Sequence, residues 1–393
     1  MEPKLRFKEF SGDWEEKKLK DEALFLQGLT YSPDDVCNDG ILVLRSSNIQ
    51  DNKITYTDNV FVDKKLPDSL FVKKNDVLIC VRNGSKRLVG KTALITEKDL
   101  DHTWGAFMMI IRSHSNNTFI YHYLNSELFT KQMFKDFGTA TINQITKKML
   151  NDCSLKIPSL PEQTKIADFL STVDEKIQNQ QDKITHLENI KKGFMQKIFS
   201  RKIRFKDANG NEFPEWEEKK LGDIVTFING KAHEKNVTEE GKYIIVNSKF
   251  ISTDGKTKKY SNEIICPLKK NDIVMVMSDV PNGKAMSKCF LINKDNKYTL
   301  NQRICALRTN NEPRFILYQV NRNKYFMKFD DGIKQTNLRK EDVLNCPIFV
   351  ANIEEQQKIA DFLSSFDEKI DAEKEILEHL KELKKGLLQQ MFV

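Results

Sequence analysis

The sequence is poor in apolar runs and in paired cysteines. No stretch approaches the roughly 18 apolar residues that a membrane span needs, and the opening MEPKLRFKEF is charged, unlike a secretory signal peptide. We therefore expect a soluble, cytoplasmic protein that contacts no membrane. The seven cysteines form no CxxC pair, and none has histidines at zinc-finger spacing. This scattered set predicts reduced, buried thiols, with no bound metal and no disulfide.

Motifs of DNA-modifying enzymes are also missing. An adenine methyltransferase needs a Gly-rich cofactor loop and an Asn-Pro-Pro-aromatic loop, and a translocating motor needs GxxxxGK[ST]. None of these occurs. The Glu-x-Lys spacing of metal-dependent nucleases is present in Glu15-Glu16-Lys17 and Glu217-Glu218-Lys219, but in strips rich in charge with no apolar strand around them. A solvated charged strip is the better interpretation, and we predict no catalytic residue.

What the sequence does have is length and a modest positive charge. Its 393 residues suffice for two or three domains, each with a core of its own. The net charge of +7 suits a negatively charged partner, although a small basic excess is also common in proteins that bind nothing acidic. Charge alone does not identify the partner.

One long stretch occurs twice, at an offset of 193 residues. Glu162–Phe199 aligns with Glu355–Phe392 without a gap, and 20 of the 38 positions are identical. Neither copy contains proline, and residues that favour helix fill the interior of both. Each copy therefore predicts one helix about 57 Å long.

The first copy carries the seam of a coiled coil. Apolar residues follow one another at alternating spacings of four and three from Ile166 to Ile198. Gln180 and Lys191 interrupt this seam, and Glu373 and Lys384 interrupt it at the same places in the second copy. Matched polar layers fix the register of paired helices. The apolar stripe is wider than such a seam requires, so we expect another surface to cover its flank, formed by Phe169, Ile190, Phe362, Ile376 and Leu383.

The segments before the two helices repeat as well, although less closely. Each opens with a leading strip, residues 5–21 and 203–223, which share the phrase WEEKKL. Each then has the phrase Lys-Lys-Asn-Asp, at 73–76 and 269–272, followed by a short apolar run that predicts a buried strand. Further strands are expected from Ala106 and Ile304, and helices near Phe119 and Phe315. Each unit therefore predicts a mixed sheet with a few helices.

Polar loops follow these strands at matching places in the two units. The loops combine Arg and Lys, which bind phosphates, with Asn, Gln, Ser and Thr, which form directional hydrogen bonds with base edges in the major groove. The same residue types are also ordinary turn formers and surface residues. Taken together, the loops predict a pair of DNA-facing surfaces, while the base-reading parts of the two units differ.

The repeated phrase EEQQKIADFLSSFDEKI, preceded by a short strand and followed by KKGLLQQMF, resembles the repeated region of specificity subunits of type I restriction-modification systems. The resemblance covers the whole chain. It implies an α+β protein in which two α/β target-recognition domains are separated by two long helices that form an antiparallel coiled coil, with an internal pseudo-twofold repeat. The expected parts are a first recognition domain over 1–150, a helix over 151–199, a second domain over 200–345 and a helix over 346–393.

The resemblance also implies a function and partners. The chain would be a non-catalytic subunit that reads a bipartite, asymmetric target in double-stranded DNA, one half-site per domain. It would dock two methyltransferase subunits and two restriction subunits. S-adenosylmethionine, ATP and magnesium would be bound by those partners and not by this chain.

Two sets of candidate residues follow. The DNA-binding set comprises Arg45, Ser46, Asn48, Arg82, Asn83, Lys86, Arg87, Thr139 and Asn143 in the first unit, and Asn247, Lys249, Asn282, Lys284, Gln302, Arg303, Gln335 and Asn337 in the second. The helix-pairing and subunit-pairing set comprises Ile166, Leu170, Val173, Ile177, Leu187, Ile359, Leu363, Phe366, Ile370 and Leu380.

Two other functions fit parts of the sequence. One is a self-contained DNA methyltransferase or nuclease with an unrecognised site, which the missing cofactor loops disfavour. An assay of the purified chain for methyl transfer and cleavage separates it from the first interpretation. The other is a coiled-coil scaffold that binds only protein, which a DNA-binding test with the methyltransferase partner present would distinguish.

Overall fold

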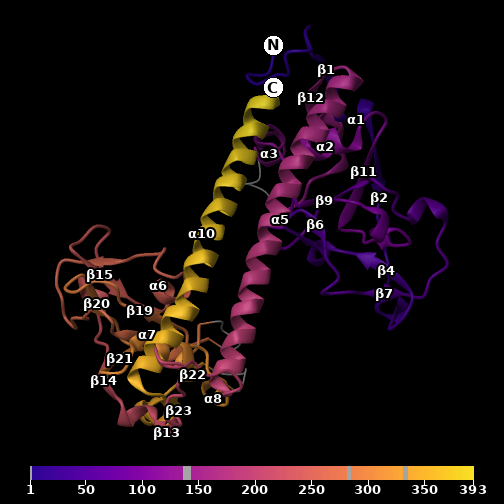
Figure 1. The fold of residues 1–393 in the computed structure, drawn as a ribbon. Coiled ribbons are helices and arrows are strands. Elements are labelled where there is room, and N and C mark those ends of the chain that lie inside the picture. Colours follow the sequence, from indigo (N-terminus) through magenta and orange to yellow (C-terminus); the bar gives the residue numbers. More distant parts are fainter. Residues whose placement is uncertain (1, 136–142, 281–284, 331–334) are drawn as a thin grey trace. The chain divides into compact units, whose positions relative to one another are not determined.

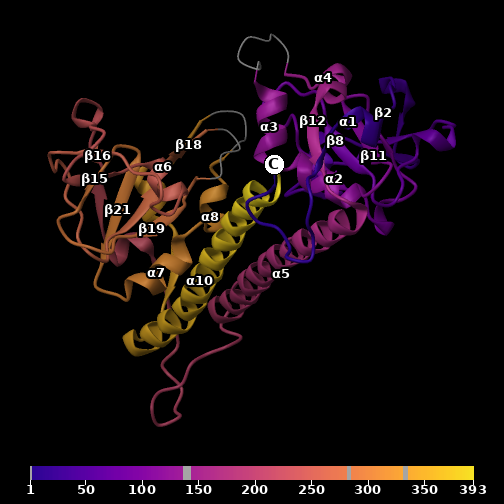
Figure 2. The same ribbon diagram turned by 90° about the horizontal axis from the view of Figure 1, so that it is seen from above.

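The computed structural model describes residues 2–135, 143–280, 285–330 and 335–393. The chain divides into two compact units, and both long helices contribute to each of them. Unit 1 comprises residues 1–182 and 374–393, and unit 2 comprises residues 183–373. The long helices are α5 (Leu160–Phe199) and α10 (Ile353–Met391), which begin two residues before the repeated stretches that start at Glu162 and Glu355. Figures 1 and 2 show the remaining elements gathered around one or the other part of these helices.

Unit 1 is built on two sheets. The first is antiparallel, in the order β2-β11-β8-β9, and the second has the order β10-β4-β7-β3 with a parallel pair β4/β10. Its strands are β1 (Glu15–Lys18), β2 (Ala23–Gln27), β3 (Val36–Cys37), β4 (Ile41–Leu44), β5 (Ile49–Gln50), β6 (Lys53–Ile54), β7 (Phe61–Val62), β8 (Val77–Cys80), β9 (Thr92–Leu94), β10 (Thr103–Trp104), β11 (Met108–Ser113) and β12 (Ser154–Ile157). Its shorter helices are α1 (Leu19–Glu22), α2 (Asn117–Leu124), α3 (Glu127–Phe134) and α4 (Lys147–Asp152).

Unit 2 repeats this plan. An antiparallel sheet β14-β21-β17-β19 accompanies a second sheet β16-β15-β20, in which β15 and β20 are parallel. Its strands are β13 (Glu217–Lys220), β14 (Val225–Asn229), β15 (Tyr243–Val246), β16 (Tyr260–Ser261), β17 (Ile273–Val276), β18 (Ser278–Asp279), β19 (Cys289–Leu291), β20 (Tyr298–Leu300), β21 (Ile304–Thr309), β22 (Thr336–Asn337) and β23 (Pro347–Val350). The shorter helices are α6 (Ser248–Ser252), α7 (Pro313–Val320), α8 (Lys324–Met327) and α9 (Lys340–Leu344).

The apolar runs of the sequence form the central strands because both faces of the antiparallel sheet are covered. Along β8, Val77 and Ile79 pack in the core with α2 and α5, whereas Leu78 and Cys80 pack in the core with the second sheet. Strand β17 alternates in the same way between the two cores of unit 2. A strand covered on two sides must be apolar at consecutive positions. The predicted mixed sheets and buried strands are therefore confirmed.

The repeated phrase Lys-Lys-Asn-Asp has a structural role at the start of these strands. Asn75 and Asn271 adopt the left-handed backbone conformation, with φ of 66° and 72°, which Asn tolerates better than most residues. The following buried aspartate holds an arginine of the neighbouring strand through two hydrogen bonds. Asp76 accepts from Arg112 at 2.7 and 2.6 Å, and Asp272 accepts from Arg308 at 2.7 Å in both bonds.

The leading strips are more ordered than the sequence predicts. Instead of a solvated strip without a strand beside it, Glu15–Lys18 forms β1 and pairs antiparallel with β12, where Leu155 and Ile157 are buried. The equivalent strand β13 pairs with β23. A four-residue charged strand is stable here because a partner with an apolar face supplies the backbone hydrogen bonds. That part of the prediction was wrong.

The long helices pack antiparallel within each unit. In unit 1, Ile166 and Leu170 near the start of α5 share a core with Leu388 and Met391 near the end of α10. In unit 2, Ile198 near the end of α5 shares a core with residues near the start of α10. Of the predicted pairing residues, six are buried and four are half-buried: Ile166, Leu170, Val173, Ile359, Leu363 and Ile370 in the first class, Ile177, Leu187, Phe366 and Leu380 in the second.

Three of the four polar seam positions, Lys191, Glu373 and Lys384, form ion pairs. Lys384 lies 2.5 Å from Asp174 in unit 1, and at the equivalent place in unit 2 Lys191 pairs with Asp367. Glu373 lies 2.6 Å from Lys183. Part of the expected flank is covered by the leading strips, since Phe7 packs on Phe169 and Phe205 packs on Phe362, each at 5.7 Å between ring centroids. Two flank residues of α10, Ile376 and Leu383, remain exposed.

Candidate nucleic-acid interface

In unit 1, three polar segments that lie far apart in the sequence meet at the end of β8. They are the turn after β4, the loop that follows β8, and the residues before α4. The Asn83 side chain donates to Ser46 Oγ at 3.0 Å, and the Asn83 backbone N–H donates to the Asn143 carbonyl at 3.3 Å. The Asn143 side chain donates to the Gly84 carbonyl at 3.2 Å. These bonds join the predicted DNA-binding loops of unit 1 into one surface.

The cations of this surface differ in their environment. Arg45 is half-buried and pairs with Asp58, whose carboxylate lies 2.9 Å from the guanidinium. Arg82, Lys86 and Arg87 are exposed on the loop after β8. The Arg82 guanidinium lies over the ring of Phe107, 5.2 Å from its centroid. A polyanion can therefore reach the second group of cations without breaking the Arg45 pair.

The structure does not support the prediction for Asn48. Its side chain is 0% exposed and is used inside the turn. Its oxygen accepts from the Arg45 backbone N–H at 2.9 Å, and its nitrogen donates to the carbonyls of Thr55 at 3.0 Å and Asp58 at 3.2 Å. A side chain that satisfies three backbone groups in the interior stabilises the loop and cannot contact a base from this position.

Unit 2 forms a surface at the equivalent place, beyond the end of β17. Strand β22 pairs with β18 so that Gln335 and Asn337 are exposed while Thr336, between them, is buried. The Gln335 side chain donates to Ser278 Oγ at 2.6 Å. The exposed turn of Gln302 and Arg303 is held to the same edge, because the Met277 N–H donates to the Arg303 carbonyl at 2.9 Å.

The remaining predicted residues of unit 2 lie on or beside α6. Lys249 is exposed in the first turn of this helix. Asn247 is half-buried and caps the helix, since its side chain accepts from the Phe250 backbone N–H at 2.9 Å. Its amide oxygen is therefore engaged in a structural hydrogen bond, a role that the sequence did not distinguish from base reading. Three predicted residues, Thr139, Asn282 and Lys284, lie outside the described residues.

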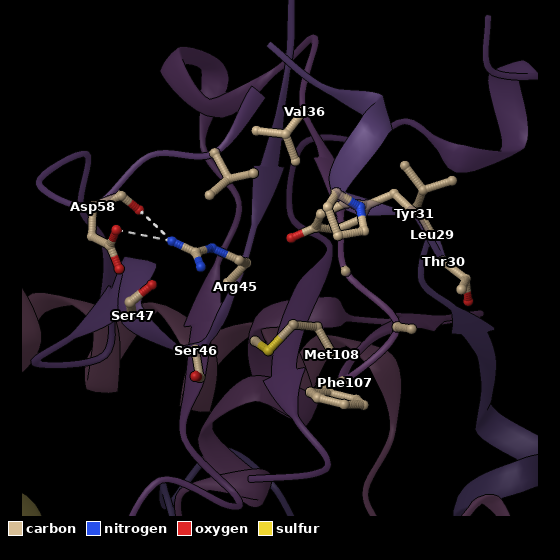
Figure 3. A pocket seen from close by; sticks show the side chains of 14 residues that line it. Leu29, Thr30, Tyr31, Val36, Arg45, Ser46, Ser47, Asp58, Phe107 and Met108 are labelled. Carbon is tan, nitrogen blue, oxygen red and sulfur yellow. Dashed lines mark hydrogen bonds and ion pairs between the residues drawn. The ribbon is translucent and has the colours of Figure 1, made fainter. Parts of the chain in front are cut away.

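Sequence reasoning missed the apolar part of the first surface. A pocket of about 710 Å³ opens beside Arg45 and Ser46. Figure 3 shows Val36 and Tyr31 on one side of it and Met108 and Phe107 on the other, with Arg45 directed to Asp58. Phe107 is 58% exposed. The signal that could have found it is an aromatic residue in a turn between two apolar strands.

Two glycines that the sequence analysis passed over bring the ends of β2 and β14 close to these surfaces. A Cβ on Gly28 would lie 2.2 Å from the Gly105 carbonyl oxygen, and one on Gly230 would lie 1.8 Å from that of Asn301. Only glycine permits this approach, which lets the Leu29 N–H donate to the Trp104 carbonyl at 2.7 Å. The turns that carry Phe107 and Arg303 are thereby held against the ends of β2 and β14, respectively.

The chemistry available near these surfaces is limited. All seven cysteines are free thiols and six of them are buried. Burial raises the pKa of Cys80, at the end of β8, to about 11, so this thiol is a poor nucleophile at neutral pH. Among the described residues, no group of three or more His, Cys, Asp and Glu side chains lies close enough to hold a metal ion. In the same part of the chain, no helix is both long and apolar enough to cross a membrane.

Several known proteins with a similar sequence belong to one family. The family model for the type I restriction modification DNA specificity domain matches residues 11–189 and 214–382. The type I restriction enzyme StySPI specificity subunit of Salmonella potsdam is 27% identical over 297 residues, which span 69% of this chain and 62% of that protein. The putative type I restriction enzyme MjaX specificity subunit of Methanocaldococcus jannaschii is 24% identical over 407 residues, 98% of this chain and 94% of that one.

A solved structure has the same fold along the whole chain. The S subunit of a type I restriction-modification system from M. genitalium superposes with a TM-score of 0.59 at 19% identity, covering 100% of this chain and 99% of that one. The predicted α+β class and internal repeat are confirmed. The family model covers both halves of the sequence, each with its mixed sheets and most of its long helix. The chain therefore belongs to the family of the type I restriction modification DNA specificity domain.

Proposed function

We propose that this chain is the DNA-recognition subunit of a type I restriction-modification complex and reads a bipartite, asymmetric target. In this proposal residues 1–150 recognise one half-site and residues 200–345 recognise the other. The chain itself catalyses no reaction. Methyltransferase and restriction subunits, two of each, supply the chemistry and bind S-adenosylmethionine, ATP and magnesium.

One observation carries the proposal. The two units repeat the same scaffold, yet the side chains presented at the end of the central strand differ. Unit 1 presents Arg82, Lys86 and Arg87 with an apolar pocket beside them, whereas unit 2 presents Arg303, Gln335 and Asn337. Arg, Asn and Gln are the side chains that discriminate bases in the major groove. A repeated scaffold with different reading groups is what two unlike half-sites require.

The charge of the two surfaces agrees with this role. Arg82, Lys86 and Arg87 are exposed in unit 1, as are Lys249 and Arg303 in unit 2. Exposed cations bind phosphates and position the protein, while neighbouring amides read base edges. Of the predicted DNA-binding set, Asn48 is now excluded, and the others within the described residues are retained in the proposal.

The helices supply the surface that we assign to the methyltransferase subunits. Ile376 and Leu383 lie seven residues apart on α10, therefore on one helix face, and are 47% and 52% exposed. Exposed apolar residues on a rigid helix favour a protein partner over DNA. This surface differs from the two polar surfaces, so binding of DNA and of a methyltransferase subunit are compatible.

An exchange of residues 200–345 for the matching segment of a relative tests the two-reader proposal. The variant complex should methylate a target with one new half-site and one original half-site. Sequencing of methylated DNA identifies both. A change in both half-sites together, or in neither, would contradict the assignment of one half-site to each unit.

A charge variant tests the surface itself. Replacing Arg82, Lys86 and Arg87 with Ala should weaken binding to all DNA sequences and lower the salt dependence of the binding constant, because three phosphate contacts are removed. Lys98→Ala is the matched control, since Lys98 is exposed at the opposite end of the same sheet. Equal loss of binding in the control would locate the DNA elsewhere.

A further inference from the structure

The exposed ring of Phe107 is the least expected feature of the unit 1 surface. It occupies the turn between β10 and β11, and its carbonyl accepts from the Val81 and Arg82 backbone N–H groups at 3.0 and 3.2 Å. The backbone is therefore held firmly, while 58% of the residue faces solvent. Exposing a large aromatic side chain on a rigid turn forfeits the free energy that its burial would supply. A functional contact accounts for this arrangement.

The equivalent turn of unit 2 carries a cation instead. Met108 pairs with Cys80 in unit 1, and Ile304 pairs with Val276 in unit 2, so the residues before them, Phe107 and Arg303, correspond. The two turns are also held by equivalent hydrogen bonds. The Val81 N–H donates to the Phe107 carbonyl in unit 1, and the Met277 N–H donates to the Arg303 carbonyl in unit 2. The scaffold thus presents one side chain at the same place in each unit, aromatic in one and basic in the other.

The surroundings of Phe107 indicate what it contacts. The Arg82 guanidinium lies over the ring, 5.2 Å from its centroid, so that a positive charge and an apolar group lie side by side. This pair matches DNA, in which a negatively charged phosphate backbone borders the apolar methyl groups of the major groove. The pocket next to the ring is walled by Tyr31, Val36 and Met108 (Figure 3). Two of its polar atoms, Arg45 Nε and Ser47 Oγ, are buried and have no hydrogen-bond partner within the described ranges of the chain.

We infer that Phe107 is a specificity-determining residue that contacts the C5-methyl group of a thymine in the half-site read by unit 1. This inference rests on the proposed function. The methyl group is the apolar feature of the major groove, and aromatic side chains are among the groups that contact it. Arg82, fixed against the same ring, contacts the adjoining phosphate or base. The corresponding Arg303 gives the other half-site no such preference.

Deoxyuridine substitution tests this contact, because it removes the methyl group and leaves base pairing unchanged. Each thymine of the target, on either strand, is replaced in turn, and binding by the complex of this chain with its methyltransferase subunit is measured. One replacement in the first half-site should weaken binding about fourfold, the effect of one buried methyl group. In Phe107→Ala the same replacement should have no effect, whereas Phe107→Tyr should retain it.

Two control variants separate the contact from general damage. Arg303→Ala changes the equivalent position of unit 2 and should leave the fourfold response in the first half-site intact. Leu24→Ala removes another apolar side chain of unit 1, which is 48% exposed on β2. This variant should also keep the fourfold response in the first half-site. A thermal melt of each variant establishes that it is folded.

The outcomes distinguish this inference from the function on which it rests. A wild-type complex without sequence preference would contradict the proposed function itself. A sequence-specific complex that is insensitive to every deoxyuridine, or whose first half-site has no A·T pair, would overturn the Phe107 assignment alone. If Phe107→Ala lost binding without any deoxyuridine response in wild type, the ring would act by stacking on a base, and the methyl contact would again be wrong.

Discussion

At the scale of single residues, one buried glutamate attaches each leading strip to a long helix. Glu162, the third residue of α5, accepts from Arg6 at 2.8 and 2.9 Å and from the Trp14 indole at 3.3 Å. Glu355, the third residue of α10, accepts from Arg204 at 2.8 and 3.0 Å and from Trp216 at 2.8 Å. Both carboxylates lie at the positive end of a helix dipole, which stabilises them further.

We predict that Glu162→Ala destabilises unit 1 by about 2–3 kcal/mol, because the mutation removes the acceptor of a buried indole N–H and of the Arg6 Nε and Nη2 groups, while Arg6 Nη1 keeps its bonds to Glu2 and Gly12. Glu15→Ala is the matched control. Its carboxylate is mostly exposed and pairs with Lys17 at 3.3 Å, so its loss should cost less than about 1 kcal/mol. Denaturant titration followed by tryptophan fluorescence measures the loss of stability in both variants. Equal losses would contradict the role of Glu162 in attaching the leading strip to α5.

A second residue, His122, is buried on α2 beside the helix pair of unit 1. Its Nδ1 lies 3.9 Å from Asp174, too far for a hydrogen bond, because Lys384 holds that carboxylate at 2.5 Å. Burial, followed by the charge of Lys384, lowers the pKa of His122 to about 3. The imidazole is therefore neutral in the folded protein at neutral pH. Unit 2 has Tyr318, which does not titrate in this range, at the corresponding position of α7.

This difference predicts an acid-sensitive unit 1. Between pH 6.5 and about 3 the unfolded chain binds a proton at His122 and the folded chain does not. The free energy of unfolding therefore has its full value above pH 6.5 and falls as the pH is lowered below it. The slope is about 1.4 kcal/mol per pH unit, or roughly 2 kcal/mol lost by pH 5. Unfolding of wild type and His122→Gln between pH 7 and 5 tests this. The variant should lose less stability over that range, and parallel curves would contradict the assignment.

At the scale of elements, the seam of the long helices combines apolar layers with ion pairs. Asp174 with Lys384, and Asp367 with Lys191, occupy equivalent positions in the two units. Each pair is partly buried, so a shifted register would leave two charges without partners in an apolar seam. The apolar layers supply most of the stabilisation, whereas the ion pairs select the antiparallel register.

We predict that Ile370→Asp disrupts helix packing more than Ile177→Asp, although the two residues are equivalent in the repeat. Ile370 is 5% exposed, whereas Ile177 is half-buried and lines an open polar pocket. A carboxylate at the first position loses several kcal/mol of hydration, and one at the second stays in contact with water. Thermal unfolding and recovery of methyltransferase subunits on co-purification measure the difference. The reverse order would mean that the seam lies elsewhere.

At the scale of the whole molecule, each long helix runs without a break from one unit into the other. In the proposed function the helices therefore set the number of unread base pairs between the half-sites. Within each unit the long helices share the core with the strand that leads to the polar surface, Val77 and Ile79 of β8 in unit 1 and Ile273 and Met275 of β17 in unit 2. A change of helix length between the two units should therefore leave both reading surfaces intact.

Insertion of four residues into each helix, after Asp182 in α5 and after Glu373 in α10, tests whether helix length sets the spacing between the half-sites. The insertion adds about 6 Å and about 40° of rotation to each helix. DNA rises about 3.4 Å per base pair, so the spacer should lengthen by one or two base pairs while both half-sites stay the same. Sequencing the methylated sites decides the matter. An unchanged spacer in a fully active complex would show that the helices do not set the distance.

The sequence by itself determined the parts of this protein whose burial follows a period. The long helices, the buried strands β8 and β17 and the duplication of the whole unit were all predictable, because heptad spacing and short apolar runs encode burial along one dimension. The grouping of polar loops at the end of the central strand was also predictable in outline, since equivalent loops follow equivalent strands.

Only the tertiary structure decided which polar side chains are enclosed in the fold and which lie at the surface. Asn48 and Asn83 are alike in sequence, yet the first is enclosed in its turn and the second joins two surface loops. Glu162 meets Arg6 across 156 residues, and Phe107 is 58% exposed in a turn that is held beyond the end of the central strands β8 and β11. Hydrogen bonds and exposure depend on which atoms come within a few ångströms after folding, and no local spacing contains that information.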